Sequence, residues 1–304
     1  MLLYGGSHLS GVQLKSETIR RPRCGSVPHP FENRYITCHK IVFVRMKNVV
    51  WIASYPRSGN TWFRYLLTFS LFVKSESSEN IFLPTKYIPD MYQFKDISSL
   101  QIPEIGWHGQ QVSFFKTHKC ELPYQEIEQV KTLGFIYLYR HPLDVLLSAI
   151  NHLYIENRDK FFHDQKVHSA DELKTDGKLA MYVEKFSKSQ LKIWPWHGFA
   201  GTYQENVNYW LNLSKQNIYP ISLVFKYEDL FADTFGQLSR LKEQFIIGDD
   251  QIRRAIILSQ NYTNDGGKFY WKKKSGNYKE YLDEETIIRF NERHEVFLEQ
   301  LGYL

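Results

Sequence analysis

The chain has 304 residues, of which 43% are hydrophobic and 16% are aromatic, which is enough apolar material to fill the core of one globular unit. The formal net charge of +5 is modest and is not gathered in one block, so charge alone does not indicate nucleic-acid binding and is compatible with a small anionic ligand. No apolar run approaches the roughly 18 residues of a membrane span, so we expect no membrane-spanning helix.

Residues 1–45 differ from the rest of the chain. Clusters of glycine, serine, arginine and proline, such as those at 5–7 and 20–23, break any hydrophobic periodicity, and no signal-peptide pattern is present. The first core strand follows directly after Met46 and its two polar neighbours. We therefore expect residues 1–45 to be a poorly ordered N-terminal extension and residues 46–304 to form one functional domain.

The three cysteines, Cys24, Cys38 and Cys120, show neither the spacing of a disulfide framework nor that of a metal site. Cysteine used in this way is typical of a reducing compartment, so we expect a cytoplasmic protein. No constellation of metal ligands appears elsewhere in the sequence, and we expect no metal.

The stretch 49–64, VVWIASYPRSGNTWFR, predicts a strand, a loop and a helix. Its apolar, partly β-branched run ends at Pro56, and beyond the loop apolar residues recur at helical spacing. Such a turn aims successive backbone N–H groups and the positive end of the helix dipole at one point, and Arg57, Ser58 and Thr61 add donors. The stretch therefore predicts a site for a phosphate-like anion. It lacks the GxxxxGK[ST] spacing of a nucleotide-triphosphate loop, which weakens a kinase or ATPase interpretation.

A second strand is predicted over residues 111–115, and Lys116 and His118 follow it. In doubly wound sheets the chemistry gathers at the carboxyl ends of the strands. An imidazole that titrates near neutrality can take a proton from a hydroxyl, and a cation beside it can stabilise developing negative charge. The pair therefore predicts a site of proton transfer.

A third strand is predicted over residues 135–139, followed by Arg140 and by a helix with Pro142 in its first turn. Arg140 offers a planar fork of donors that suits a phosphate, and Ser148 lies about two turns into the helix, on a face that can close over the same group. Asp144 has an ordinary explanation, because an acid in the first turn of a helix complements the helix dipole. We therefore leave Asp144 outside the site.

The remaining predicted elements are, in chain order, loops with short helices over 75–110, a mobile loop or lid in the first part of 155–200, a strand over 221–225, helices over about 232–245 and 250–259, and an amphipathic helix over about 283–301. Tyr227 and the two acids after it are expected to close the fourth strand and cap the next helix. The lysines at 272–274, close to Gly276, fit a flexible lid over an anion.

These stretches resemble, in the same order, motifs of the cytosolic-type, bacterial-like sulfotransferases. The loop YPRSGNTW is similar to the 5′-phosphosulfate loop YPKSGTTW, with Arg57 in place of Lys and Asn60 in place of Thr. The sequence at 116–118 matches the family's KTH, and Arg140 and Ser148 keep the spacing of the 3′-phosphate motif RNPKDVxVS.

The resemblance covers about residues 48–300 and implies a fold, a donor and a reaction. The implied fold is a single α/β domain of P-loop-like topology, with a mainly parallel central sheet flanked by helices. The implied donor is 3′-phosphoadenosine 5′-phosphosulfate (PAPS). Its sulfuryl group would move in line to a hydroxyl or amine of a small-molecule acceptor and leave adenosine 3′,5′-bisphosphate. The implied catalytic residues are His118 as general base, Lys116 and Arg57.

The same resemblance implies the residues that contact the donor. The loop would hold the 5′-phosphosulfate, Arg140 and Ser148 the 3′-phosphate, and Tyr203 aligns with an aromatic residue that contacts adenine. Trp271 stands where the family has a phosphate-binding Arg, so a neighbouring lysine would have to supply that charge. The implied set is Arg57, Ser58, Gly59, Asn60, Thr61, Trp62, Arg140, Ser148, Tyr203, Lys272 and Lys273.

Two rival interpretations stay open. A kinase of related topology would need a metal-holding Ser or Thr directly after a loop Lys and a Walker-type Asp, and the sequence shows neither. A protein that binds the nucleotide but has lost turnover is the second alternative. It is compatible with the last motif, in which Trp271 replaces the family's phosphate-binding Arg. The aromatic residues of 75–110 and 155–200 suit an aromatic or apolar acceptor. The family's dimer motif is not seen in the C-terminal helix, so the oligomeric state is open.

Overall fold

The structure of the protein is a computed structural model that describes residues 46–73, 83–93, 97, 100–123, 130–157, 160–162, 166–263 and 274–304. The predicted N-terminal extension, residues 1–45, lies outside the described residues, so that boundary stays a prediction. Within the described ranges, no helix is both long enough and apolar enough to cross a membrane.

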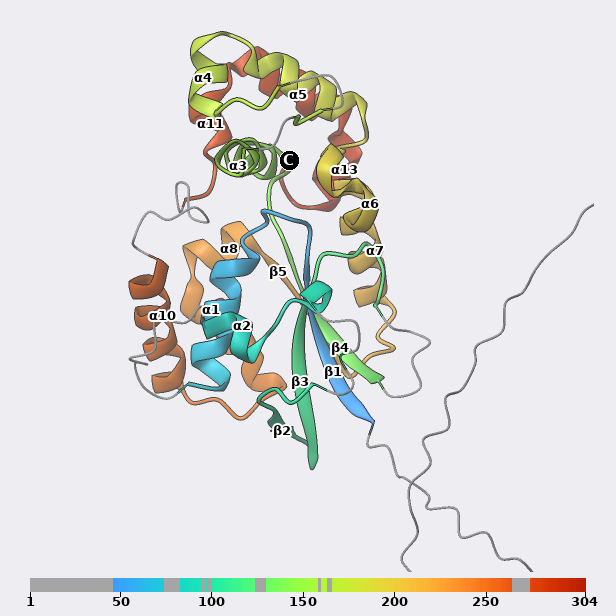
Figure 1. Ribbon diagram of the computed structural model, residues 1–304, viewed down its shortest axis with the longest axis vertical. Coiled ribbons are helices and arrows are strands. Elements are labelled where there is room, and N and C mark those ends of the chain that lie inside the picture. The colour runs from blue at the N-terminus through green and yellow to red at the C-terminus, as the bar shows by residue number, and fades with distance from the viewer. Residues whose placement is uncertain are drawn as a thin grey trace, which may run out of the picture. The chain divides into compact units, whose positions relative to one another are not determined.

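The domain is built on a five-stranded sheet with the strand order β2-β3-β1-β4-β5 (Figure 1). The strands are β1 Lys47–Ser54, β2 Ile105–Trp107, β3 Gln110–Thr117, β4 Val130–Tyr139 and β5 Ile221–Lys226. All neighbouring strands are parallel except β2, which pairs with β3 in the antiparallel sense. The four predicted strands are confirmed, whereas the edge strand β2 lies in a stretch where only loops and short helices were expected.

The parallel register brings the carboxyl ends of the central strands level with one another. Ala53 of β1 lies opposite both Thr117 of β3 and Tyr137 of β4. The residues that follow these strands, among them His118 and Arg140, therefore meet at one edge of the sheet, which is where open α/β sheets bind their ligands.

Helices cover both faces of the sheet (Figure 1). One face carries α1 Asn60–Leu71, α2 Leu83–Tyr87, α8 Tyr227–Ala232 and α10 Asp249–Thr263, the other carries α7 Tyr203–Lys215, and α3 Pro142–Ile155 lies beyond the carboxyl ends of the strands. Side chains of β1 alternate between the two layers, because successive residues of a strand point to opposite faces. Val50 packs with Phe63 of α1, whereas Trp51 packs in the layer that contains Trp210 of α7.

The other helices are short. They are α4 Ala170–Thr175, α5 Leu179–Lys188, α6 His197–Ala200, α9 Thr234–Ser239, α11 Tyr278–Tyr281, α12 Glu284–Arg293 and α13 Glu295–Gln300, with 3₁₀ turns at Met91–Gln93, Trp194–Trp196 and Arg240–Glu243.

The expectation of a mobile loop in the first part of 155–200 is wrong for α4 and α5. Ser169 caps α4, since its Oγ accepts a hydrogen bond from the Glu172 backbone N–H at 3.1 Å while the Glu172 carboxylate accepts one from the Ser169 N–H at 3.0 Å. On α5, Tyr182 and Phe186 are buried in the core. The capping box and this apolar face stabilise two helices in a stretch that is otherwise polar.

The predicted C-terminal helix is broken in two at His294. α12 ends at Arg293 and α13 begins at Glu295, and His294 between them has φ −115° and ψ 19°. The His294 Nε2 atom lies 2.8 Å from Ser187 Oγ on α5, and both side chains are buried. This buried polar contact fixes the position of the break.

Candidate active site

A cavity of about 940 Å³ opens where the carboxyl ends of β1, β3, β4 and β5 meet. It brings together nine of the residues predicted from three separate motifs: Arg57, Gly59, Asn60, Thr61, Trp62, Lys116, His118, Arg140 and Ser148. Lys272 and Lys273 lie outside the described residues, so their predicted place beside the donor is not addressed by the structure.

The loop between β1 and α1 has the backbone that an anion site needs. Arg57 has φ +70° and Gly59 has φ +98°, both in the left-handed region. A Cβ atom on Gly59 would lie 2.5 Å from Cδ2 of Tyr227, so only glycine fits at this position. The first turn of α1 follows directly, and its N–H groups have no carbonyl partner within their own helix. The loop therefore presents backbone donors and the positive end of a twelve-residue helix to the cavity.

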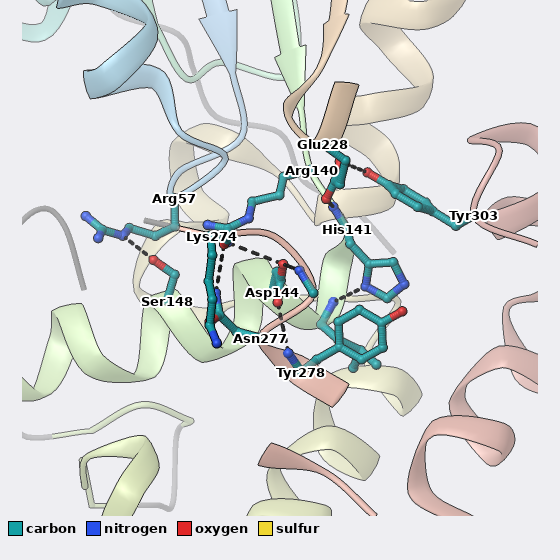
Figure 2. Close-up of polar contacts among 12 residues, drawn as sticks. Arg57, Arg140, His141, Asp144, Ser148, Glu228, Lys274, Asn277, Tyr278 and Tyr303 are labelled. Atoms are coloured by element: carbon teal, nitrogen blue, oxygen red, sulfur yellow. Dashed lines mark hydrogen bonds and ion pairs between the residues drawn. The ribbon is translucent and has the colours of Figure 1, made fainter. Parts of the chain in front are cut away.

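Two loop side chains make hydrogen bonds beside the anion site, one of them to another motif. Arg57 Nε donates to Ser148 Oγ on α3 at 3.1 Å, so the first and third motifs are already in contact (Figure 2). Asn60 Nδ2 donates to Ser54 Oγ at 3.0 Å. Ser58 does not line the cavity, because its side chain is fully buried behind the loop.

The imidazole of His118 has a defined tautomer. Its Nδ1 atom lies 2.6 Å from the carbonyl oxygen of Ser54, and a carbonyl only accepts, so Nδ1 carries the proton. The Nε2 atom is then the unprotonated one. Burial, together with the charge of Lys116, lowers the pKa of His118 to about 3, against smaller opposing effects of Asp90 and the Ser54 carbonyl. His118 is therefore neutral at pH 7 with an unprotonated Nε2, but in this structure it does not titrate near neutrality as the sequence predicted.

Lys116 lies beside His118 and forms an ion pair with Asp90 inside the cavity. Burial lowers the pKa of the Lys116 ammonium, and the Asp90 carboxylate opposes that effect. The ion pair fixes the Lys116 ammonium close to the neutral imidazole of His118, two residues further along the chain.

Arg140 is held at the end of β4 by contacts on several sides (Figure 2). One terminal nitrogen donates to the Lys274 carbonyl at 2.8 Å and to Asp144 Oδ2 at 3.3 Å. The guanidinium carbon lies 4.3 Å from the centre of the Tyr227 ring, in cation–π contact. Lys274 is the first described residue after the lysines at 272 and 273.

Asp144, predicted to serve only the helix dipole, joins α3 to the segment 274–278 beside the site. Its carboxylate is buried, and it accepts hydrogen bonds from the backbone N–H groups of Gly276 at 2.8 Å and Tyr278 at 3.0 Å. The same carboxylate accepts the Arg140 contact described above. The helix-dipole explanation accounts for an acid at this position, but it could not show that the acid joins two distant segments.

His141 begins α3 and is buried. Its Nδ1 accepts from the Leu143 N–H at 3.3 Å, and its own N–H donates to Glu228 Oε1 at 2.9 Å. The other oxygen of Glu228 accepts from the Tyr303 hydroxyl at 2.9 Å, which ties the C-terminal residues to the start of α3 (Figure 2). Burial, with the nearby charges of Lys226, Lys279 and Arg140, lowers the pKa of His141 to about 3.

Tyr203 does not line the cavity, and its ring offers no face to a purine. The side chain is fully buried, packs edge-on against Tyr55 with ring centres 5.4 Å apart, and donates its hydroxyl to the Arg140 carbonyl. Tyr203 therefore supports Arg140 from behind.

Three other aromatic residues line the cavity beside the anion loop. The Trp62 ring lies 5.7 Å from Tyr227 and 6.3 Å from Phe231, and Tyr227 and Phe231 stack at 6.2 Å. Tyr227 was expected only to close a strand, so its place in the cavity corrects that interpretation. The signal that sequence analysis missed is its position directly after β5, at the same edge as the other motifs.

A second aromatic wall lies among the cavity residues. Tyr92 and Phe199 make an edge contact with ring centres 5.4 Å apart, and Trp196 and His152 also line the cavity. Both Tyr92 and Phe199 are more than one-third exposed, at 44% and 37%. This wall comes from the two stretches whose aromatic content suggested an aromatic or apolar acceptor.

Comparisons with known proteins show the family and the fold of the chain. Residues 47–302 match the family described as the sulfotransferase domain. Among solved structures, the chain is similar to mouse sulfotransferase SULT7A1 complexed with PAP, with a TM-score of 0.50 and 15% sequence identity over 82% of this chain and 84% of that one. At this identity the structural likeness concerns the fold alone. No match is found among curated protein sequences.

Proposed function

The chain belongs to the sulfotransferase family, and from that membership we propose that it moves a sulfuryl group in line from PAPS to a hydroxyl or amine of a small-molecule acceptor, leaving adenosine 3′,5′-bisphosphate. The observation that carries the proposal is the shared cavity. An anion-binding loop, the Arg140–Ser148 pair and a neutral histidine with a free Nε2 all face the same space.

The described residues fit the two anionic ends of this donor. We assign the 5′-phosphosulfate to the loop, where residues 59–62 form the start of α1 and the side chains of Arg57 and Thr61 line the cavity. We assign the 3′-phosphate to Arg140 and Ser148, with a lysine at 272 or 273 as a third contact. The Lys274 carbonyl on Arg140 supports that third contact, because it brings the end of the lysine stretch to the guanidinium.

We assign the adenine to the pocket of Trp62, Tyr227 and Phe231. Aromatic faces and edges suit a purine, and Thr234, Gln260 and Thr263 add polar atoms to the same lining. This assignment replaces Tyr203, whose buried ring cannot reach a ligand in the cavity.

His118 acts as the general base in this proposal. Its Nδ1–H stays on the Ser54 carbonyl, which fixes the ring, and Nε2 takes the proton of the acceptor hydroxyl. Lys116 stabilises negative charge that develops on the transferred group and its bridging oxygen. Arg57, in the loop between β1 and α1, stabilises the same charge. The aromatic wall of Tyr92 and Phe199 favours an aromatic or apolar acceptor.

His118→Ala tests this mechanism against a protein that binds the nucleotide without turning over. PAPS is incubated with a panel of small phenols, alcohols and amines, beginning with 2-naphthol, and release of adenosine 3′,5′-bisphosphate is measured. Loss of a positioned base is expected to lower turnover by roughly 100-fold or more. Binding of the bisphosphate should be retained, because His118 makes no predicted contact with it.

The matched control is His168→Ala, which removes an exposed histidine paired with Glu172 on the surface. Its turnover should equal that of the wild type. Unchanged turnover in His118→Ala would remove this residue from the mechanism. A wild-type protein that binds the bisphosphate but turns over no member of the panel would favour the binding-protein alternative.

A further inference from the structure

Asp90 is an acidic side chain in a cavity whose other charged lining residues are cations. Among the described residues that line the cavity it is the only acid, whereas Arg57, Lys116 and Arg140 are positive. An anionic donor gains nothing from a carboxylate beside its reacting end, so this residue needs another explanation. The acceptor role expected of the aromatic residues in 75–110 does not account for Asp90.

The position of Asp90 is built into the fold. Residues before it run alongside the end of β3, with the Lys116 N–H donating to the Pro89 carbonyl at 2.8 Å and Asp90 bridged to Lys116 in parallel register. The buried side chain of Arg64, on α1, donates to the Pro84 carbonyl at 3.0 Å and also to the Ile88 carbonyl. The segment is therefore anchored by two core elements, α1 and β3.

Both carboxylate oxygens of Asp90 are used. Oδ2 pairs with the Lys116 ammonium, and Oδ1 accepts from the Tyr92 backbone N–H at 3.2 Å. The two paired side chains are 19% and 16% exposed, so water screens the pair only weakly. This contact fixes the direction of the Lys116 side chain, which is otherwise a flexible four-carbon stem.

The charges around Lys116 explain why a partner is needed. Burial lowers the pKa of the ammonium, and the positive charges of Arg64 and Arg57 lower it too; of the groups that face it, Asp90 is the one that raises it. His118, the remaining titratable neighbour, is neutral. Without Asp90, the pKa of the Lys116 ammonium would be lower still, and its side chain would lose the contact that fixes its direction.

We propose that Asp90 is a positioning residue: its carboxylate aims the Lys116 ammonium at the reacting groups and keeps it charged inside the cavity. The inference rests on the proposed function, since sulfuryl transfer is what gives that charge its use. Asp90 also favours the imidazolium that His118 becomes when it takes a proton, because a nearby negative charge stabilises a positive one.

The direct test is an NMR titration of Lys116 in the full-length protein, with the side-chain resonance assigned by its loss in Lys116→Arg. In Asp90→Asn, which keeps the shape of the side chain, the pKa of Lys116 should fall by about one pH unit or more. Asp176→Asn is the matched control, because Asp176 pairs with Lys178 at 3.0 Å on the surface, and it should leave the Lys116 titration unchanged.

A purely structural role for Asp90 would not move that titration. If Asp90→Asn folds with a wild-type melting temperature and Lys116 titrates as before, the inference is wrong. With an active acceptor, the losses in kcat from Asp90→Asn and Lys116→Met should be less than additive, since both remove one interaction, and Asp90→Glu should recover part of the loss. Fully additive losses would count against the inference.

The outcome can be separated from that of the proposed function. Asp90→Asn should bind adenosine 3′,5′-bisphosphate about as tightly as the wild type, because Asp90 acts on Lys116, and Lys116 is assigned to the transferred sulfuryl group, which the bisphosphate lacks. If neither protein binds the bisphosphate, the proposed function fails, while the Lys116 titration still decides the role of Asp90.

Discussion

At the scale of single residues, His141 shows how a substitution within a motif can be absorbed by the structure. The related motif has Asn at this position, and Asn is among the favoured residues for capping a helix. His141 does the same with Nδ1, which accepts from the Leu143 N–H. That contact requires a neutral imidazole with an unprotonated Nδ1, packed 4.1 Å from the Tyr278 ring. The structure therefore uses a titratable group where a neutral amide would serve.

His141→Asn is predicted to flatten the pH dependence of stability. The folded pKa of His141, about 3, lies below its ordinary value of 6.5, so the unfolded chain binds the proton first as the pH falls. Stability from the neutral ring is therefore present above pH 6.5 and is lost toward pH 3, by about 2 kcal/mol between pH 7 and pH 5. Urea unfolding at several pH values measures the slope.

The control for that experiment is His168→Asn, since His168 lies on the surface. It should show the wild-type slope of the unfolding free energy against pH. A His141→Asn protein with the same slope as the wild type would show that His141 is not held neutral by the fold.

At the scale of elements, α3 and the segment 274–278 form one wall of the site through a single carboxylate. The Asp144 side chain receives two backbone N–H groups from that segment and a contact from Arg140 (Figure 2). Hydrogen bonds to a buried charged group are worth more than neutral ones, and a donor left without a partner is costly. The wall therefore depends on the charge of Asp144 as well as on its shape.

Asp144→Asn is predicted to loosen this wall. The amide keeps one acceptor oxygen but turns an N–H₂ group toward one of the two backbone donors, which leaves that donor unsatisfied. We expect a loss of about 1–3 kcal/mol in the free energy of unfolding. Hydrogen exchange at Gly276 and Tyr278 should become faster than in Glu280→Gln, which removes the charge of an exposed acid that pairs with Lys274. Equal protection in the two variants would contradict this role.

The sequence predicted those elements whose pattern is local. The four parallel strands are short apolar runs bounded by turn residues, and each was placed correctly. The helix α4 carried a local signal too, the Ser169–Glu172 capping box, which was overlooked. The break at His294 had no such signal, because it depends on a contact with Ser187, more than a hundred residues away in the chain.

At the scale of the whole molecule, the site is assembled by the parallel register of the sheet. Motif order allowed the prediction that the anion loop, His118 and Arg140 would share one edge, and the structure brings them together. The roles of Asp90 and Tyr203 could not be predicted in this way. Asp90 reaches Lys116 because a loop docks on β3, and Tyr203 is buried because α7 packs against the same sheet. Both positions depend on tertiary packing, which cannot be predicted from local patterns in a single sequence.

The central claim is that this cavity binds a nucleotide with phosphates at both its 3′ and 5′ positions. Titration calorimetry of the purified protein with adenosine 3′,5′-bisphosphate in EDTA, against ATP, tests it most directly. We expect binding without metal that is at least about tenfold tighter for the bisphosphate. Arg140→Ala should weaken it by roughly 10- to 100-fold, since a charge-assisted contact to phosphate is lost, while Arg289→Ala, on the surface, should not. Absent binding, or equal binding of ATP, would contradict the assignment of the donor.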